Sequence, residues 1–467
     1  MKYTGEKVSS VMGGICERKS NNVIITGVST DTRKINSGDL FFCIQGENFD
    51  GHNFAEKAIE KGAVCVVAHK EIKGDFPVIY VKDTLKAYGR LAGDYKSLYN
   101  VKTVAVTGSV GKTSTKEFVA HLAGLAGKTL KNEANFNNEI GLPLTLFNLD
   151  NTYRNLVVEM GMRGKGQINY LCSIAKPKIA VISNISVCHI ELLGSQDSIA
   201  DAKCEILDNL PSDGVGIVNG DSEYLPLMKK RCRCRLYTYG EKETNDIYIK
   251  NIEANNEGFV YSLKTPWGDI DNIFITGIVY HNVINSMPAV AVAKILGAGN
   301  EEIREKIGQF KNIEKRFNII DCKDFTLIDD CYNASPLAVE GALKTLDLFK
   351  NKRKIAVLGE MYELGDLEKS SHIHIGQAAK KYGVDKLVCV GPLAKYIGEG
   401  FEQTDTIFAN MGDEKSDKNI YYFENSDEAG GFIQTFVKEN DVVLVKGSHG
   451  VHMEKITEKL LSLNNNN

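Results

Sequence analysis

The segment VTGSVGKTSTKEF (residues 106–118) decides how the rest of the chain is interpreted. It begins at the end of a short apolar run, KTVAV, and leads into KEFVAHLAGLAG, where Phe118, Val119, Leu122 and Leu125 recur at helical spacing. A strand that feeds a glycine-rich turn into a helix places backbone N–H groups and the positive end of the helix around an anion. The segment therefore predicts a phosphate-binding loop.

The residues of this loop have separate expected roles. Gly108 and Gly111 allow the tight turn, while Lys112 would reach the β and γ phosphates of ATP. The Thr113 hydroxyl would bind Mg²⁺. The usual fingerprint has a glycine at the position of Val106, which counts against an ordinary GTPase or motor ATPase, and a chance Gly-Lys-Thr sequence is the alternative. The full set expected to hold the nucleotide is Gly108, Ser109, Val110, Gly111, Lys112, Thr113 and Ser114.

Composition is that of an ordinary soluble chain of about three domains. The 467 residues, 43% hydrophobic and 25% charged, are too many for one core. The net charge of −4 and the lack of a lysine- or arginine-rich stripe argue against nucleic acid as a partner. We expect no signal peptide and no membrane span, because the apolar runs are short. Eleven cysteines without zinc spacing favour a reducing, cytoplasmic setting.

The order of the predicted elements indicates an α/β fold with three domains. Residues 1–83 mix short strands with one helical pattern and form a small mixed domain. Residues 84–313 alternate strands, glycine-rich turns and helices, which is typical of a parallel-sheet ATPase domain of the phosphate-loop type. Residues 314–467 restart the alternation and form a C-terminal Rossmann-like α/β domain.

Two polar residues follow apolar strands later in the central region. Glu159 ends the strand LVVEMG, and His189 follows the strand IAVISNIS. Because ligands bind beyond the carboxyl ends of the strands in an open α/β sheet, both side chains would face the phosphates held by Lys112. A carboxylate and an imidazole suit a divalent cation, although Mg²⁺ prefers oxygen. A satisfied loop residue explains His189 equally well, whereas a charge at the end of an apolar strand needs a partner.

The loop also carries a family resemblance. TGSxGKT followed by Ser or Thr is the form found in the Mur ligases and the related folylpolyglutamate synthases, and the sequence resembles that superfamily here. The resemblance implies that Glu159 and His189 bind a second magnesium ion. It also implies that Lys203, in the amphipathic segment SIADAKCEILDNL, is the lysine that is often carbamylated and then binds magnesium. Without the resemblance, Lys203 would be interpreted as a surface lysine.

Two further segments of the central region, and one at its boundary with the C-terminal region, resemble the superfamily. NFNNEIGLP matches the family segment between the phosphate loop and the substrate, YHNVINS matches the start of the adenine-contacting helix, and EKRF carries an arginine near the nucleotide. Taken alone, an asparagine-rich loop and a helix cap explain the first two. The residues implied are Asn135, Asn137 and Asn138 for phosphate or sugar oxygens, His281, Asn282 and Asn285 for adenine, and Arg316 for the nucleotide.

The C-terminal region narrows the resemblance to one branch of the family. DDCYNASP (residues 329–336) is similar to the string of the members that add D-alanyl-D-alanine. Asp330 would hold the ribose hydroxyls, and Asn333 and Ser335 would contact substrate or nucleotide. Lys446 would bring a positive charge to the closed interdomain site, although a solvated strand-end lysine is the plainer interpretation. His449 stands where the family usually has an arginine, which removes a formal charge.

The N-terminal region agrees with this branch. VSTDTR (residues 28–33) and IQGENFDGHNF (residues 44–54) match the family segments that hold the uridine diphosphate of the muramyl substrate, and folylpolyglutamate synthases lack this domain. An arginine fork fits phosphate well. Gln167 stands where the family usually has a glutamate, which is a second difference from the family pattern after that at His449. The substrate-binding residues implied are Ser29, Thr30, Asp31, Arg33, Gly46, Asp50 and His52.

Together the matches imply an ATP- and Mg²⁺-dependent ligase. It would join D-alanyl-D-alanine to UDP-N-acetylmuramoyl-tripeptide through an acyl phosphate, for peptidoglycan synthesis. These two substrates would be its partners, and we expect no nucleic acid, no membrane span and a monomeric chain. The alternatives are another Mur-type or folylpolyglutamate-type ligase and a P-loop kinase or regulatory module. Lysine and meso-diaminopimelate both stay open as the third residue of the peptide.

Overall fold

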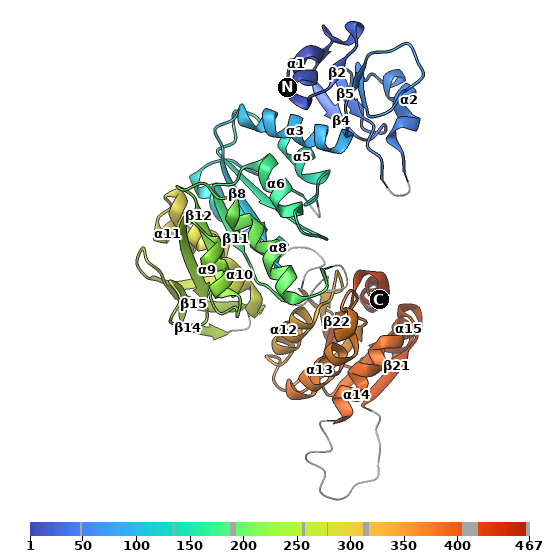
Figure 1. Cartoon of the computed structure of the whole chain (residues 1–467). Coiled ribbons are helices and arrows are strands. Elements are labelled where there is room, and N and C mark those ends of the chain that lie inside the picture. Colours follow the sequence, from blue (N-terminus) through green and yellow to red (C-terminus); the bar gives the residue numbers. More distant parts are fainter. Residues whose placement is uncertain are drawn as a thin grey trace, which may run out of the picture.

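The protein consists of three successive α/β units. The computed structural model describes residues 1–46, 49–133, 136–186, 193–254, 257–277, 279–311, 317–403 and 419–463. Figure 1 shows the N-terminal unit at the top, the central unit at the left and the C-terminal unit at the bottom. Each unit has its own sheet, whose described strands lie within residues 15–80, 102–276 and 318–446. The α/β class is confirmed, and domain boundaries at 83/84 and 313/314 stay predictions.

The N-terminal unit is built on a mostly parallel sheet of order β2-β7-β6-β5-β4 within the described residues. Only β2 runs antiparallel to its neighbour there. A short antiparallel pair, β1 with β3, lies beside it. The elements are β1 (Tyr3–Thr4), α1 (Gly5–Met12), β2 (Ile15–Cys16), η1 (Arg18–Ser20), β3 (Ile24–Ile25), β4 (Gly27–Ser29), β5 (Asp39–Phe42), η2 (Gly51–Phe54), α2 (Ala55–Glu60), β6 (Cys65–Ala68) and β7 (Val78–Tyr80).

Helix α3 (Thr84–Ser97) belongs to two cores at once. Its N-terminus is capped by Asp83, whose carboxylate accepts the N–H of Lys86 at 2.9 Å. Tyr88 packs into the N-terminal core, while Ala92 and Tyr95 pack into the central core. The helix therefore joins the first two units through buried apolar surface.

The central unit has a long mixed sheet of order β16-β15-β14-β13-β12-β11-β8-β10-β9 within the described residues. Strands from β9 to β14 in this order pair in parallel, and β15 and β16 add an antiparallel extension. The strands are β8 (Lys102–Thr107), β9 (Thr129–Lys131), β10 (Asn155–Glu159), β11 (Ile179–Ile182), β12 (Val215–Asn219), β13 (Arg235–Gly240), β14 (Ile247–Ala254), β15 (Gly258–Lys264) and β16 (Ile270–Thr276). The helices are α4 (Lys112–Ala123), α5 (Gly141–Leu146), α6 (Gln167–Ala175), α8 (Gln196–Asp208), α9 (Leu225–Arg231), α10 (Tyr280–Leu296) and α11 (Asn300–Gly308), with η3 (Gly124–Ala126) after α4.

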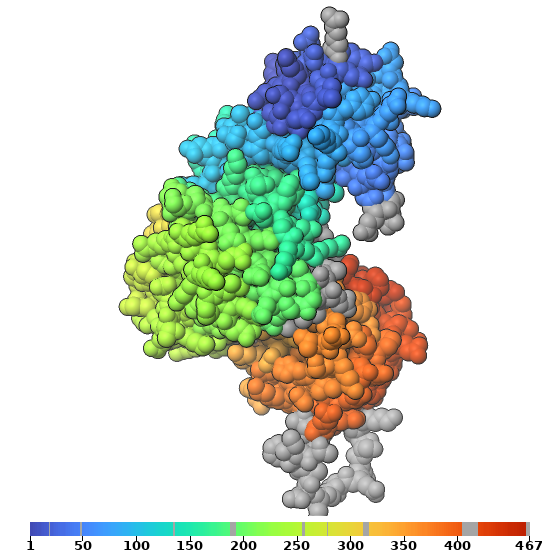
Figure 2. All heavy atoms as spheres, in the orientation of Figure 1, coloured from blue at the N-terminus to red at the C-terminus, as the bar shows by residue number. Residues whose placement is uncertain are grey.

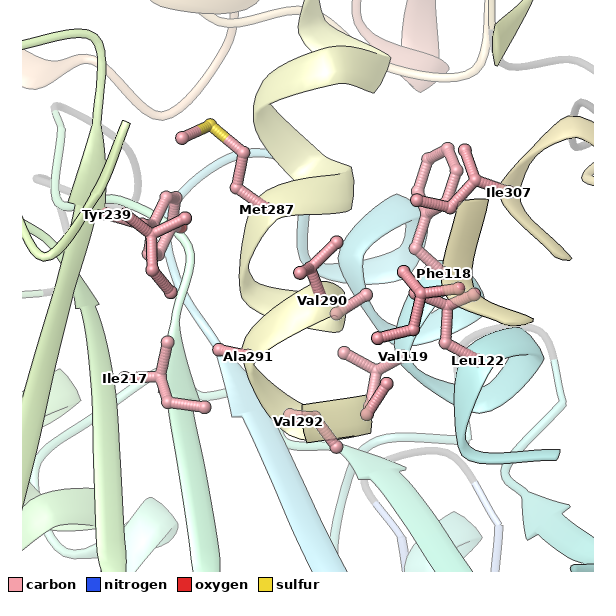
Figure 3. Close-up of a cluster of buried hydrophobic side chains, with 14 of the residues drawn as sticks. Phe118, Val119, Leu122, Ile217, Tyr239, Met287, Val290, Ala291, Val292 and Ile307 are labelled. Carbon is pink, nitrogen blue, oxygen red and sulfur yellow. The ribbon is translucent and has the colours of Figure 1, made fainter. Parts of the chain in front are cut away.

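A buried apolar cluster fixes helix α4 against the sheet and against helix α10 (Figure 3). Phe118 and Val119 on α4 are fully buried, as is Val290 on α10. Phe118 also stacks on Phe310, with ring centroids 3.7 Å apart. Because α4 cannot move without opening this cluster, the loop at its N-terminus is held in place by packing.

The C-terminal unit has a sheet of order β17-β18-β22-β19-β20-β21 within the described residues, and all pairs except β17 with β18 are parallel. This arrangement fits the expected Rossmann-like alternation. No described helix is long and apolar enough to cross a bilayer. The elements are β17 (Asn318–Asp321), β18 (Phe325–Asp330), α12 (Pro336–Leu346), β19 (Arg353–Gly359), η4 (Gly365–Leu367), α13 (Glu368–Lys381), β20 (Lys386–Val390), η5 (Pro392–Ala394), α14 (Lys395–Gln403), β21 (Ile420–Phe423), α15 (Ser426–Phe436), β22 (Asp441–Lys446), η7 (His449–Val451) and α16 (Glu454–Ser462).

Candidate active site

The phosphate-binding loop, residues 108–111, connects strand β8 to helix α4. Gly111 has a left-handed backbone, with φ of 77°, and a Cβ on Gly108 would lie 2.0 Å from the Oγ of Ser183. Both positions therefore require glycine. Gly111 has no side chain to cap α4, so the N–H groups of the first helical turn can bind an anion. The Nζ of Lys112 lies over the loop and donates to the carbonyl of Ser109 at 3.1 Å.

The segment after strand β11 supports the loop from one side. The side chain of Asn184 accepts the N–H of Val110 and donates to its carbonyl, both at 2.9 Å. Ser183 donates to the same carbonyl at 2.7 Å. Ser109 and Ser186 exchange two hydrogen bonds, at 2.9 and 3.0 Å. Strand β11 pairs directly with β8, so both strands deliver their carboxyl ends to one edge of the sheet.

Strand β10 pairs with β8 on its other side and delivers Glu159 to the same edge. Glu159 is 2% exposed, and its Oε2 accepts the hydroxyl of Thr113 at 2.8 Å. Its Oε1 accepts the side-chain amide of Asn137 at 2.8 Å. The structure thus brings together three residues that the sequence singled out, although 46 residues separate Thr113 from Glu159. Asn138 instead caps the next turn, accepting the N–H of Gly141 at 2.9 Å.

Lys203 lies on helix α8, inside the same region and not on the surface. Its side chain is 2% exposed, and its Nζ donates to the carbonyl of Gly108 at 2.9 Å. The plain surface interpretation is wrong, because the helix face that carries Lys203 packs under the loop. A buried ammonium group beside a phosphate loop adds positive charge where an anion is expected.

The start of helix α10 lies against the other side of the loop. A Cβ on Gly111 would lie 2.9 Å from the Oδ1 of Asn285, and that oxygen accepts the hydroxyl of Thr115 at 3.3 Å. His281 lies one turn earlier, and the backbone N–H of Asn282 donates to the carbonyl of Val279 at 2.9 Å. Of the three expected adenine-contacting residues, Asn285 therefore lies next to the phosphate loop.

His281 also faces the C-terminal unit. A Cβ on Gly341, in helix α12, would lie 2.2 Å from its ring. Burial lowers the pKa of His281 to about 4, and the nearby positive charges of Lys344 and Lys446 act in the same direction. The imidazole is therefore neutral at neutral pH and joins two units of the chain.

The C-terminal unit contributes a charged pair at the carboxyl edge of its own sheet. Asp330 and Lys446 end the adjacent parallel strands β18 and β22 and lie opposite each other in register. The Nζ of Lys446 donates to Asp330 at 2.6 Å and to the carbonyl of Asn333 at 2.9 Å. Lys446 is 2% exposed, so it is not a solvated strand-end lysine. Ser335 directly precedes helix α12. Its Oγ is buried and has no hydrogen-bond partner among the described residues.

The first expected substrate segment follows strand β4. Ser29 is buried, and its hydroxyl donates to the carbonyl of Asp31 at 3.0 Å. Arg33 forms a two-point ion pair with Asp31, at 2.9 and 2.8 Å, and this pairing lowers the pKa of Asp31 to about 2. The Arg33 side chain is 85% exposed, and Thr30 is partly buried beside it. An exposed guanidinium next to a rigid turn can turn towards an incoming phosphate.

The second expected substrate segment follows strand β5, the parallel neighbour of β4. Gly46 is exposed, and its N–H donates to the carbonyl of Phe49 at 2.7 Å. Asp50 bonds the Nδ1 of His52 at 2.6 Å and pairs with Lys70, and this pairing lowers the pKa of Asp50. His52 is buried, which lowers its pKa. Both substrate segments thus lie at the carboxyl edge of one sheet.

Three expected site residues lie outside the described part of the chain: Asn135, His189 and Arg316. Their roles stay predictions. The sequence interpretation in turn missed residues that support the site, namely Asn132, Ser183 and Asn184. Asn184 stands in the run IAVISNIS that was recognised as a strand, but only its position beside the loop reveals its contacts.

The described residues of the site could hold a magnesium ion that takes only a few of its ligands from the protein. They contain no cluster of three or more His, Cys, Asp and Glu residues placed to hold a metal. Glu159 is a buried carboxylate whose oxygens accept from two neutral groups, the hydroxyl of Thr113 and the amide of Asn137. Its negative charge therefore calls for a cation. Mg²⁺ is typically bound by one or two carboxylates together with substrate phosphates and water, which matches this donor set.

Comparison with known proteins gives matches along nearly the whole chain. Residues 24–96 match the Mur ligase family catalytic domain, residues 106–293 the Mur ligase middle domain and residues 315–449 the Mur ligase glutamate ligase domain. The UDP-N-acetylmuramoyl-tripeptide--D-alanyl-D-alanine ligase of Bacillus subtilis is 34% identical over 461 residues, covering 97% of this chain and 96% of that one.

Solved structures give the same result. The fold is similar to that of MurF from Acinetobacter baumannii, with a TM-score of 0.90 and 29% identity over 99% of both chains. It is also similar to the MurF ligase of Thermotoga maritima in complex with ADP, with a TM-score of 0.82 and 26% identity over 93% of this chain and 97% of that one. The chain therefore belongs to the Mur ligase family.

Proposed function

We propose that this chain joins D-alanyl-D-alanine to UDP-N-acetylmuramoyl-tripeptide in an ATP-dependent ligation that forms ADP and phosphate. The observation that carries the proposal is that Lys112, Thr113 and Glu159 lie together at one edge of the sheet. The chain is also 34% identical, over nearly its full length, to the UDP-N-acetylmuramoyl-tripeptide--D-alanyl-D-alanine ligase of Bacillus subtilis. The similar Thermotoga maritima ligase was solved with ADP, which supports ATP as the energy source here.

Peptide bond formation from a free carboxylate needs activation. ATP transfers its γ-phosphoryl group to the terminal carboxylate of the tripeptide, which gives an acyl phosphate. The amine of D-alanyl-D-alanine then attacks the acyl carbon, and phosphate leaves. Two anions must meet in the first step, so the residues of the chain act mainly by neutralising charge and by alignment.

The phosphate loop supplies the alignment. The open N–H groups of the first turn of α4 bind the phosphates, and Lys112 turns from the Ser109 carbonyl towards the γ-phosphoryl group. Lys203 holds the Gly108 carbonyl and so keeps the loop in its turn. In the carbamylated form that the family resemblance implies, Lys203 would instead carry negative charge at this position.

Thr113 and Glu159 would hold Mg²⁺ together with the phosphates. The ion supplies positive charge against the γ-phosphoryl group when it is bound. The residues contribute a fixed geometry, because Glu159 is buried and is oriented by Thr113 and Asn137. His189 and, in its carbamylated form, Lys203 are the other two members of the metal-binding set proposed from the sequence.

The other two units bind the remaining groups. We assign the UDP group to the two segments after β4 and β5, where Arg33 provides the phosphate fork. Asp330 holds the ribose of ATP, and Lys446 faces the reacting groups. In the view of Figure 2 the surface is hollowed between the N-terminal and C-terminal units. Movement of the C-terminal unit across this hollow would exclude water from the acyl phosphate.

Phosphate release tests the proposal. The protein is incubated with ATP, Mg²⁺ and UDP-N-acetylmuramoyl-tripeptide, with and without D-alanyl-D-alanine, and the product is weighed by mass spectrometry. Tripeptides ending in lysine and in meso-diaminopimelate are assayed in parallel. We expect release that requires both substrates and yields the UDP-linked pentapeptide. Phosphate release that does not depend on the dipeptide would favour a kinase or regulatory module. Phosphate release that requires another amine would favour a different ligase of the family.

A further inference from the structure

A side chain outside every recognised motif holds the end of strand β10. Asn132 lies just after strand β9 and is fully buried. The N–H of Glu159 donates to its Oδ1 at 2.8 Å, and its Nδ2 donates to the Glu159 carbonyl at 3.1 Å. One amide group therefore satisfies both backbone polar groups of Glu159.

The same amide reaches the neighbouring asparagine loop. The Nδ2 of Asn132 also donates to the carbonyl of Phe136 at 2.8 Å. Phe136 directly precedes Asn137, whose own amide bonds the Oε1 of Glu159. Asn132 thus fixes Glu159 from its backbone and fixes the position of the group that orients its carboxylate.

Asn132 is itself held by a buried lysine on helix α4. The Nζ of Lys116 donates to the backbone carbonyl of Asn132 at 2.8 Å, and Lys116 is 1% exposed. Its charge is balanced by Glu117, 2.7 Å away. Since α4 also begins with Lys112 and Thr113, one rigid helix anchors the phosphate loop and the group that positions Glu159.

We propose that Asn132, held by Lys116, is a positioning residue for Glu159. It sets the carboxylate at the distance from Thr113 and the bound phosphates at which the pair can share a divalent cation. The proposal rests on the proposed function and deepens it. Without the amide, the end of β10 keeps its strand pairing with β8 but loses both bonds to the Glu159 backbone and the bond that places Phe136 beside Asn137.

The site provides its own matched control. Asn155 begins the same strand that Glu159 ends, is 1% exposed, and donates its side-chain amide to the carbonyls of Ala123 and Gly127 at 2.9 and 3.3 Å. Asn132→Leu and Asn155→Leu each remove a buried, backbone-bonded amide and keep the same number of side-chain heavy atoms with the same branching. A general loss of stability affects both variants, whereas loss of positioning affects only Asn132→Leu.

The first measurement is the Mg²⁺ concentration that gives half-maximal binding of a fluorescent ATP analogue, which does not depend on ligation. We expect Asn132→Leu to raise this Mg²⁺ concentration about 10-fold or more, which is the usual effect of removing a residue that orients a metal ligand. We expect Asn155→Leu to change the same concentration by less than about 2-fold. The second measurement is ligation per folded molecule. We expect kcat to fall about 10- to 100-fold in Asn132→Leu with KM for both substrates within about 3-fold.

Lys116→Met is a second variant in case Asn132→Leu does not fold, because it frees the Asn132 carbonyl and leaves the amide in place. It should shift the Mg²⁺ dependence in the same direction. An unchanged Mg²⁺ dependence in the folded variants, or equal shifts in Asn132→Leu and Asn155→Leu, would overturn the positioning role. Failure of the unmodified chain to ligate would instead overturn the proposed function, and the Mg²⁺ measurement would still decide the role of Asn132.

Discussion

Acidification should weaken the contact between the central and C-terminal units, because a neutral histidine is packed into it. His281 lies partly buried against Gly341 of helix α12. Burial lowers its pKa to about 4, Lys344 and Lys446 add to the effect, and Glu241 opposes it. A proton on His281 would therefore face two positive groups with little solvent to screen them.

The sign and size follow from the difference between the two pKa values. When the units separate, His281 returns to its usual pKa of 6.5, so the separated state binds protons more tightly. The contact is at full strength above pH 6.5 and loses strength as the pH falls towards 4. Between pH 7 and pH 4.5 the two values give a loss of about 2–2.5 kcal/mol, or roughly 60-fold in the equilibrium. Partial exposure of the ring makes this an upper figure.

Histidine titration by NMR measures the effect directly. The ring signals of the nine histidines are followed from pH 8 to pH 4, and His281 is identified by the signal that disappears in His281→Gln. We expect its midpoint well below 6.5, with a change in the Gly341 amide signal at the same pH. The unfolding free energy should also fall more steeply with acid in the unmodified chain than in His281→Gln. A midpoint near 6.5 with an unmoved Gly341 signal would refute the reasoning.

Three other substitutions test the site and its support. Lys112→Ala should lower kcat by about 100-fold or more in the phosphate-release assay while circular dichroism stays unchanged, because one preorganised charge on the phosphoryl group is lost; a smaller effect than 10-fold would contradict its role. Glu159→Ala should lower kcat by a similar order, and normal ligation by this variant would remove the metal assignment. Phe118→Ala should cost about 3–5 kcal/mol in denaturant unfolding, because it empties a buried site that stacks on Phe310, and a cost below 1 kcal/mol would contradict the anchoring of α4.

The phosphate loop could be predicted from sequence because its determinants are local. A strand, two glycines and a helix within about twenty residues define the turn, and the structure gives Gly111 a left-handed backbone. The apolar runs of β8, β10 and β11 also read correctly as buried parallel strands, since both faces of the sheet are covered.

The remainder of the site depends on strand order, which no local pattern contains. Asn132 and Asn184 act on the loop and on Glu159 only because β10 and β11 flank β8 on its two sides. Lys203 looked like a surface residue because its amphipathic helix does not reveal what packs against each face. A buried lysine is rare, so its charge carries information only after its neighbours are known.

The antiparallel extension of the central sheet was also missed. Within strand β14 only Ile247 is buried and the other residues are half-buried or exposed, and β15 and β16 follow it as a meander with irregular register. Such exposure belongs to a part of the sheet that is not covered on both faces, whereas strands β8, β10 and β11 are almost wholly buried. The pattern of parallel strands and helices was therefore extended too far along the chain.

The ion pair between Asp330 and Lys446 explains how a lysine can stay buried when no substrate is bound. Lys446 is 2% exposed and donates to Asp330 at 2.6 Å, so its charge is compensated before any ligand arrives. If ribose hydroxyls take up the Asp330 oxygens, that compensation weakens at the moment when the nucleotide is in place. The positive charge of Lys446 then becomes available to the reacting phosphate, and His281, whose pKa Lys446 already lowers, senses the same change. If Asp330 binds the ribose, nucleotide binding and the contact between the two units would be coupled through the charge of Lys446.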